Sequence, residues 1–120
     1  YNDCLALDSH KLGEEEIKVI VNEKNQITEI SKTCSIEKAI GESIGIEKIS
    51  NAYLSALYTE LEQMIVNEGL DNVFYELAFE RLITRGHYFY PVDTSNYFSM
   101  ELDTVEDFQD AINRIPKHLQ

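Results

Sequence analysis

The stretch SMELDTVEDF, residues 99–108, joins a predicted strand to a predicted helix. Glu101 and Asp103 are two residues apart, and side chains two apart on a strand point to the same face, so their carboxylates can converge. Thr104 stands at the expected N-cap of the helix, with Asp107 three residues later in a loose capping box. Carboxylates at the end of a strand, beside a helix start, predict a site for a divalent cation such as Mg²⁺. The alternative is that Glu101 is an exposed strand residue and Asp103 caps the helix.

The composition indicates one folded unit with an acidic surface. The chain has 120 residues, and 43% of them are hydrophobic, which suits a single domain with its own core. It carries 22 acidic and 10 basic residues, for a net charge of −12. This balance argues against binding to nucleic acid or to an anionic membrane surface, because both need a basic patch. Nucleotide chemistry on such a chain would depend on metal ions to offset phosphate charge.

The remaining chemistry-bearing residues exclude two further classes. Cys4 and Cys34 form no CxxC pair and have no histidine at ligand spacing, so zinc is not expected. Reduced thiols in a cytoplasmic protein are the simpler interpretation, and no apolar run is long enough to span a bilayer. The three histidines have no serine or cysteine in a nucleophile setting, so a histidine-based hydrolase is not supported.

Hydrophobic periodicity predicts an α/β order with a mixed sheet. Strands are expected at residues 4–7, 17–21, 26–30, 43–49, 87–92 and 97–102, with the second and third forming a hairpin. A first helix begins at Ser50 or Asn51 and stops at Gly69, with a buried stripe of Leu54, Leu57, Leu61, Met64 and Ile65. A second begins near Asp71, ends near Gly86, and buries Phe74, Leu77, Ala78 and Leu82. A closing helix ends at Pro116 and has the apolar stripe Val105, Phe108, Ala111 and Ile112.

Four motifs occur in a fixed order along nearly the whole chain: TEISK at 28–32, GESIGI at 41–46, FYELA at 74–78, and MELDT at 100–104 followed by two further acids. They resemble, in this order, the C-terminal half of the nucleotidyltransferase domain of sugar-phosphate nucleotidylyltransferases and phosphocholine cytidylyltransferases. The resemblance implies a Rossmann-like, three-layer α/β fold with a mixed sheet. Residues 1–120 would be a single domain or fragment, the half that binds the acceptor and the metal.

The same resemblance implies a Mg²⁺-dependent transfer of a nucleotidyl group, here expected to be cytidylyl, from a nucleoside triphosphate. The acceptor would be a phosphocholine, a phosphonate or a sugar phosphate, and pyrophosphate would leave. Glu101 and Asp103 are implied as metal ligands. Lys32 is implied as the catalytic cation that neutralises charge on the acceptor or the α-phosphate.

Substrate-binding roles are implied for Glu42, Glu76 and Tyr97, with Glu76 facing a cationic acceptor group and Tyr97 in an aromatic wall. Each residue with a stated role has a structural alternative: Lys32 a solvated hairpin lysine, Glu76 an exposed acid favoured by the helix dipole, and Tyr97 a core residue. Choline-type relatives tend to have an aromatic residue where this chain has Ser99. A sugar phosphate or an aminoalkyl phosphonate therefore stays open as the acceptor.

The five glycines are scattered and form no phosphate-binding loop. We therefore expect the nucleotide-binding half to lie upstream of this chain, and little or no catalysis by the chain alone. A sheet without its first βαβ units would leave an exposed edge, which makes a homo-oligomer possible. The alternative function is a non-catalytic acidic α/β module for protein binding or self-association.

Overall fold

The computed structural model describes residues 2–10, 13 and 16–120. Five strands form one mixed sheet: β1 Cys4–Asp8, β2 Lys18–Val21, β3 Ile27–Ser31, β4 Gly41–Lys48 and β5 Tyr90–Asp93. The helices are α1 Asn51–Glu62, the π-helical turn η1 Gln63–Asn67, α2 Glu76–Thr84, α3 Val105–Arg114 and the short 3₁₀ turn η2 Lys117–Leu119. The predicted α/β class with a mixed sheet is confirmed.

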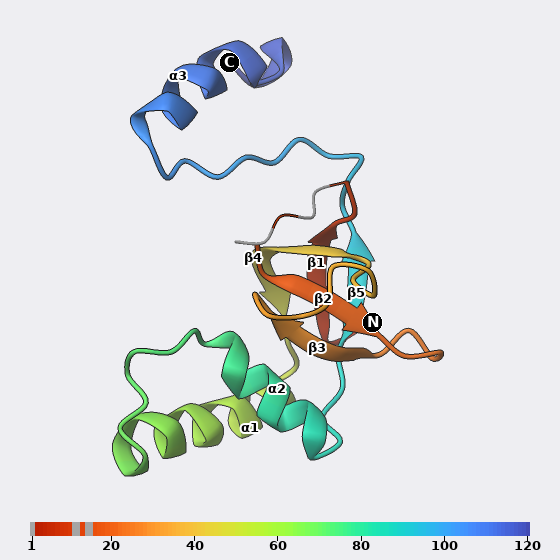
Figure 1. Ribbon diagram of the computed structural model, residues 1–120, viewed down its shortest axis with the longest axis vertical. Coiled ribbons are helices and arrows are strands. Elements are labelled where there is room, and N and C mark those ends of the chain that lie inside the picture. Colours follow the sequence, from red (N-terminus) through yellow and green to blue (C-terminus); the bar gives the residue numbers. More distant parts are fainter. Residues whose placement is uncertain (1, 11–12, 14–15) are drawn as a thin grey trace.

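The sheet has the order β3-β2-β4-β1-β5 (Figure 1). The predicted hairpin is confirmed as β2 and β3, which pair antiparallel from Lys18 opposite Ser31. β4 pairs antiparallel with both β2 and β1, whereas β1 and β5 are parallel. Strands β4 and β1 come so close at Gly41 that a Cβ there would lie 2.6 Å from the carbonyl oxygen of Asp8. Only glycine fits this approach.

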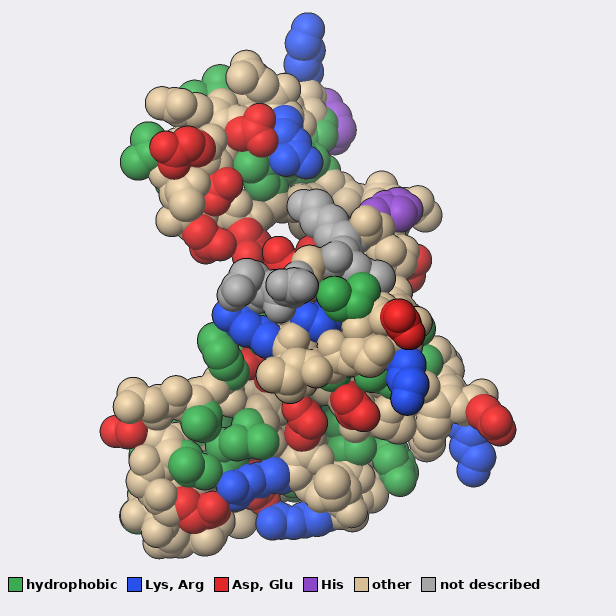
Figure 2. Space-filling view, in the orientation of Figure 1, with side chains coloured by type: hydrophobic (Ala, Val, Ile, Leu, Met, Phe, Trp, Pro, Cys, Tyr) green, Lys and Arg blue, Asp and Glu red, His purple; other side chains and the backbone are tan. Residues whose placement is uncertain are grey.

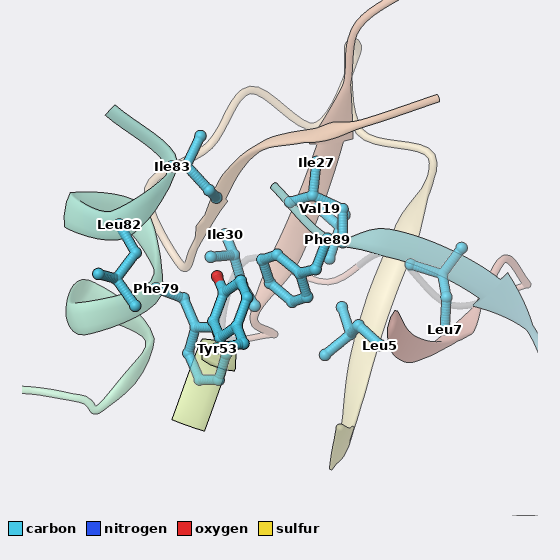
Figure 3. Close-up of a cluster of buried hydrophobic side chains, with 10 residues drawn as sticks. All are labelled: Leu5, Leu7, Val19, Ile27, Ile30, Tyr53, Phe79, Leu82, Ile83 and Phe89. Atoms are coloured by element: carbon cyan, nitrogen blue, oxygen red, sulfur yellow. The ribbon is translucent and has the colours of Figure 1, made fainter. Parts of the chain in front are cut away.

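The core lies between the sheet and the pair α1–α2 (Figure 3). α2 packs against β3 and α1, and both helices lie at one end of the sheet in Figure 1. Phe79 of α2 stacks on Phe89 at a centroid distance of 5.0 Å, and Tyr53 of α1 packs on both rings. The Tyr53 hydroxyl donates to the carbonyl of His87 over 3.1 Å, so this buried polar group is satisfied.

Two helix predictions need correction. α2 begins at Glu76 and not near Asp71, and Phe74 is 59% exposed because it precedes the helix. In α1, Leu54 is exposed, and so is Ile65 in the following turn, although both were expected in the core. Met64 of the predicted stripe is buried and Leu57 packs against the core, as expected, whereas Tyr53 and Glu60 lie on the same face without having been predicted. A helix with apolar residues on two faces does not indicate which of them is buried.

The predicted strand at 97–102 is wrong. Residues 94–104 are irregular and lead from β5 to α3, which lies beyond the opposite end of the sheet from α1 and α2 (Figure 1). A strand needs a neighbour for its backbone hydrogen bonds, and residues 97–102 pair with none of the described strands. Apolar residues of α3, Val105, Phe108 and Ile112, are exposed, and Ala111 alone of the predicted stripe is buried. The predicted end of α3 before Pro116 is confirmed.

Candidate functional site

Three of the predicted site residues line one cavity of about 340 Å³ between the sheet and the segment 94–104. We call it the linker cavity; its lining residues are Glu16, Ile17, Lys32, Ser43, Glu101 and Asp103. Lys32 comes from the turn after β3, and Glu101 and Asp103 precede α3. Figure 2 shows a hollow between the lobe that contains α3 and the rest of the molecule, with Asp and Glu side chains gathered along it. The carboxylates thus share a cavity without the strand geometry that predicted their convergence.

Glu42 lies beside this cavity rather than in it. It lines an adjoining cavity of about 280 Å³ together with Glu101, Asp103 and acidic residues of α3, and we call this the acidic cavity. Glu42 is only 8% exposed, and the sheet register places it next to Asp8 on one side and Lys18 on the other. The position in β4 therefore gives Glu42 a buried carboxylate at the edge of the site.

Buried Lys18 holds the wall of the linker cavity in place. Its ammonium group donates to the backbone carbonyls of Gly13 and Glu16, each over 3.3 Å, and to the carbonyl of Lys32. The side chain is 1% exposed, so these bonds compensate for the burial of a charge. Lys18 thereby joins two segments that supply cavity residues, those of Glu16 and Lys32. Its sequence position, on an alternating strand, did not indicate this role.

Glu76 lies in a third cavity of about 370 Å³ beside α2, the helix cavity. Lys32 is also in its lining, and its ammonium nitrogen lies 4.7 Å from the centre of the Phe74 ring. Glu76 is 6% exposed, which contradicts the alternative of a solvated first-turn acid. Within the described residues, its Oε2 has no hydrogen-bond partner. Burial also raises the pKa of Glu80, which lines the same cavity, with a smaller contribution from the charge of Glu29.

The capping box at the start of α3 is confirmed, and Asp103 is not its N-cap residue. The N-cap is Thr104, whose hydroxyl accepts from the Asp107 backbone N–H over 3.1 Å. Asp107 Oδ2 accepts the backbone N–H groups of Asp103 and Thr104, both over 3.0 Å. These bonds lower the pKa of Asp107, and the bond from the Asp103 backbone N–H makes the largest contribution. Asp103 lines the linker cavity and the acidic cavity, and its side chain is not part of the capping box.

Tyr97 is not brought to these cavities. It is 77% exposed, follows the turn after β5, and is absent from the linings of the linker, acidic and helix cavities. The alternative of a core residue is wrong for Tyr97. Its predicted contact with substrate stays a prediction.

Carboxylates that line the linker cavity have the donor chemistry for Mg²⁺, a hard cation that takes oxygen ligands. Among residues 2–10, 13 and 16–120, no three His, Cys, Asp or Glu side chains are placed to hold a metal ion together. Mg²⁺ in sites of phosphate chemistry usually keeps several waters and binds one or two carboxylates plus substrate phosphates. The pair Glu101 and Asp103 fits that requirement.

Two polar residues of the linker cavity were missed by the sequence analysis, Glu16 and Ser43. The backbone N–H of Ser43 donates to the carbonyl of Ile17 over 2.8 Å, which fixes the β4 side of the cavity against the segment before β2. Ser43 lies in the GESIGI motif, next to Glu42, and that proximity is the one signal that could have indicated it. For Glu16 the sequence offers no comparable signal, since it is one of several acids before β2.

In comparisons with known proteins, no family model and no curated sequence matches this chain. None of the helices among the described residues combines the length and the apolar character that crossing a membrane requires. Cys4 and Cys34 are both free thiols, and burial raises the pKa of Cys34.

Proposed function

We propose that this chain is the acceptor- and metal-binding part of a Mg²⁺-dependent nucleotidyltransferase, with a cytidylyl group as the expected cargo. One observation carries the proposal: Lys32, Glu101 and Asp103, separated by about seventy positions in the sequence, line the same cavity. A cation opposite two carboxylates suits a reaction in which phosphate groups and a metal ion meet. The four motifs of the sequence analysis support the same assignment.

In this function the metal would offset charge on the triphosphate while the acceptor oxygen attacks the α-phosphorus. Glu101 and Asp103 would hold the metal, and Lys18 would position Lys32 through its backbone carbonyl. The Lys32 ammonium would meet the acceptor phosphate or the α-phosphate as a point charge. Most of the rate increase would come from this positioning and from electrostatic stabilisation.

The acceptor would extend from Lys32 toward the helix cavity. There the buried Glu76 carboxylate and the Phe74 ring offer the two groups that a cationic substituent needs. A phosphate at Lys32 and an amine or quaternary ammonium at Glu76 describe phosphocholine or an aminoalkyl phosphonate. A sugar phosphate would leave Glu76 to accept hydroxyl groups.

The proposal includes an upstream nucleotide-binding half that completes a Rossmann-like, three-layer fold. Two features support it. β5 is an edge strand in parallel pairing with β1, a pairing usual in doubly wound sheets. The apolar residues Val105, Phe108 and Ile112 of α3 are exposed and would be covered by such a half.

Metal binding can be tested on the 120-residue chain with Mn²⁺ as a paramagnetic substitute for Mg²⁺, because both prefer oxygen ligands. We expect substoichiometric Mn²⁺ to broaden the amide signals of residues 99–104 and of Lys32 first. Asp103→Asn should abolish this selective broadening. Asp110→Asn is the matched control, since Asp110 lines the acidic cavity but not the linker cavity. Equal broadening at all acidic segments, or no change in Asp103→Asn, would contradict the metal assignment.

Turnover requires the complete protein with its nucleotide-binding half. We expect pyrophosphate release from CTP with phosphocholine, an aminoalkyl phosphonate or a sugar phosphate as the acceptor. Asp103→Asn should lower this release by about 10²-fold or more while the fold survives, in line with the loss of one electrostatic group from an active site. Undiminished Mg²⁺-dependent turnover in this variant would exclude Asp103 as a ligand.

The second candidate function is a non-catalytic acidic module that binds a partner. The observation in its favour is the exposed apolar stripe of α3 bordered by Glu106, Asp107 and Asp110, a surface that suits a basic, apolar partner. Selective Mn²⁺ binding at Asp103 favours the enzyme. The absence of both selective Mn²⁺ binding and pyrophosphate release would favour the non-catalytic module.

A further inference from the structure

Helix α1 carries a second apolar stripe on its solvent side. Leu54 is 51% exposed and Tyr58 is 67% exposed, and one turn further Leu61 is partly exposed. The spacing of four and three residues places the three side chains along one line of the helix. Tyr53 and Glu60 occupy the face toward the core. Leu54 and Tyr58 therefore contribute little to the packing of this chain.

The exposed residues of α1 itself carry very little charge. The exposed residues of α1 are Asn51, Ala52, Leu54, Ser55, Tyr58, Thr59 and Glu62, and Glu62 alone among them is charged. This is unusual for a chain with a net charge of −12. In a symmetric contact each patch meets its own copy, so the contact doubles any net negative charge in the patch. A surface that lacks charge is where two copies of so acidic a chain can approach each other.

The exposed stripe of α3 differs in this respect. Val105, Phe108 and Ile112 are exposed as well, but Glu106 and Asp110 flank them. A symmetric contact there would bring two acidic helices together. Charge thus separates the two stripes: α3 suits a basic partner, and α1 suits a second copy.

We propose that the α1 face is a homodimer interface, with Leu54, Tyr58 and Leu61 packed against the same residues of a second copy across a two-fold axis. Tyrosine is enriched among residues that dominate interface energies, because it buries a large ring at low entropic cost. Ser55 and Thr59 lie beside the stripe and are small enough for helices to approach. The Thr59 hydroxyl donates to the Ser55 carbonyl over 3.1 Å, so this group can leave water without losing its hydrogen bond.

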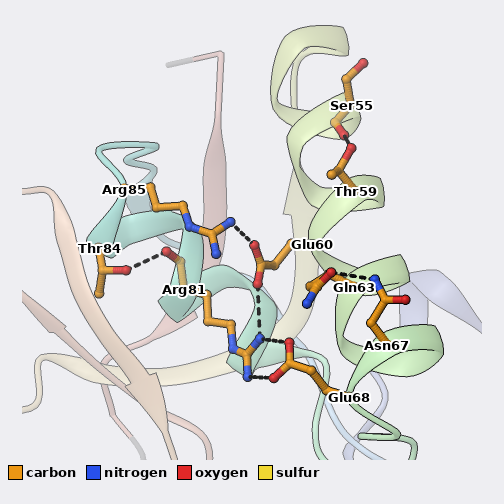
Figure 4. Close-up of polar contacts among 9 residues, drawn as sticks. All are labelled: Ser55, Thr59, Glu60, Gln63, Asn67, Glu68, Arg81, Thr84 and Arg85. Atoms are coloured by element: carbon orange, nitrogen blue, oxygen red, sulfur yellow. Dashed lines mark hydrogen bonds and ion pairs between the residues drawn. The ribbon is translucent and has the colours of Figure 1, made fainter.

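The helix is held rigidly for such a contact. Glu60, which is 1% exposed, receives hydrogen bonds from Arg81 and Arg85 of the α2 region, and Arg81 also forms a two-bond pair with Glu68 (Figure 4). These bonds fasten α1 to α2 on the side opposite the solvent. A surface that needs no rearrangement loses less entropy on association.

Sedimentation velocity on the 120-residue chain, from micromolar to millimolar concentration, tests the interface. We expect a concentration-dependent dimer that is strengthened when salt is raised, because salt screens repulsion between the acidic copies. Leu54→Glu and Tyr58→Glu should each weaken dimerisation at least tenfold. Ile112→Glu is the matched control: it makes the same change of charge at an exposed apolar residue of α3 and should leave the dimer intact.

Circular dichroism and thermal melts of each variant establish that it folds, and Tyr58→Ser, which adds no charge, should shift the equilibrium in the same direction. A wild-type chain that stays monomeric over the whole range overturns the proposal. So does a dimer that Ile112→Glu dissociates and Tyr58→Glu does not. Since the measured quantity is mass, neither result bears on the proposed enzyme function.

Discussion

The ammonium nitrogen of Lys32 lies 4.7 Å from the centre of the Phe74 ring, a contact that ties the turn after β3 to the segment before α2. The cation rests on an aromatic ring between the linker cavity and the helix cavity. Lys32 therefore has a defined place even without a bound phosphate, unlike a solvated hairpin lysine.

Phe74→Leu should cost about 0.5–1 kcal/mol of unfolding free energy through the lost cation–π contact. Phe108→Leu is the control, because both rings are 59% exposed and no cation lies over Phe108 among the described residues. Urea unfolding of the two variants gives the difference directly. Equal losses would mean that the Lys32 contact contributes nothing.

Glu60→Gln should destabilise the chain by roughly 1.5–3 kcal/mol, the range for hydrogen bonds that involve charged groups. The buried carboxylate accepts from Arg81 and Arg85, and the amide cannot accept with both of its terminal atoms. Glu62→Gln is the matched control on the exposed side of the same helix and should stay within about 0.5 kcal/mol of the wild type. Similar losses for both variants would show that the ion pairs with Arg81 and Arg85 do not stabilise the fold.

The pH dependence of stability should include a contribution from Glu47. Partial burial raises its pKa above 4.5, the Tyr75 hydroxyl opposes this by donating over 2.8 Å, and the charge of Glu76 raises it further. Because the pKa of Glu47 is higher in the folded chain than in the unfolded chain, protonation of Glu47 stabilises the fold. This stabilisation is complete below the unfolded-state pKa and is lost as the pH rises through the folded-state pKa. Glu47→Gln should therefore be more stable than the wild type at pH 7, with a gap that narrows toward acid.

A carboxyl-detected NMR titration checks which groups shift the pKa of Glu47. Tyr75→Phe should raise the pKa of Glu47, since it removes the hydrogen bond to the charged form, and Glu76→Gln should lower it by removing a like charge. A lower pKa in Tyr75→Phe would contradict the assigned contributions.

Thr104→Ala should cost about 1 kcal/mol of local stability in α3, because the hydroxyl accepts the Asp107 backbone N–H at the N-cap. The loss should be seen as faster amide hydrogen exchange in the first turn of α3 and little change in β2 and β3. Thr104→Ser keeps the hydroxyl and should exchange like the wild type. Uniform acceleration across the sheet would mean that α3 unfolds together with the core.

Local patterns in the sequence were sufficient for the hairpin and for the α3 cap. Alternation over residues 17–30 predicted β2 and β3, and the spacing of Thr104 and Asp107 predicted the capping box, because both depend on neighbours a few residues away. The strand expected at 97–102 failed for the opposite reason. Alternation describes two faces but does not say whether another strand is present to pair with.

Three of the six predicted site residues share one cavity, but the sequence did not predict their arrangement. Lys32, Glu101 and Asp103 do meet in one cavity, although no strand brings the two acids together. The burial of Glu76 and the role of Lys18 beneath Lys32 depend on contacts between distant elements, which the sequence does not reveal. The chemical roles of these residues remain predictions.

The place of β1 in the sheet has a consequence for synthesis on the ribosome. Of the five described strands β1 is made first, yet its two neighbours are β4 and β5, and β5 is not complete until Asp93. The hairpin of β2 and β3 can form as it emerges, whereas β1 gains its first neighbour only with β4 and its second only with β5. Residues 4–8 are therefore open to mispairing until β4 and β5 have been made, and a chaperone that shields them in that interval would raise the yield of folded protein.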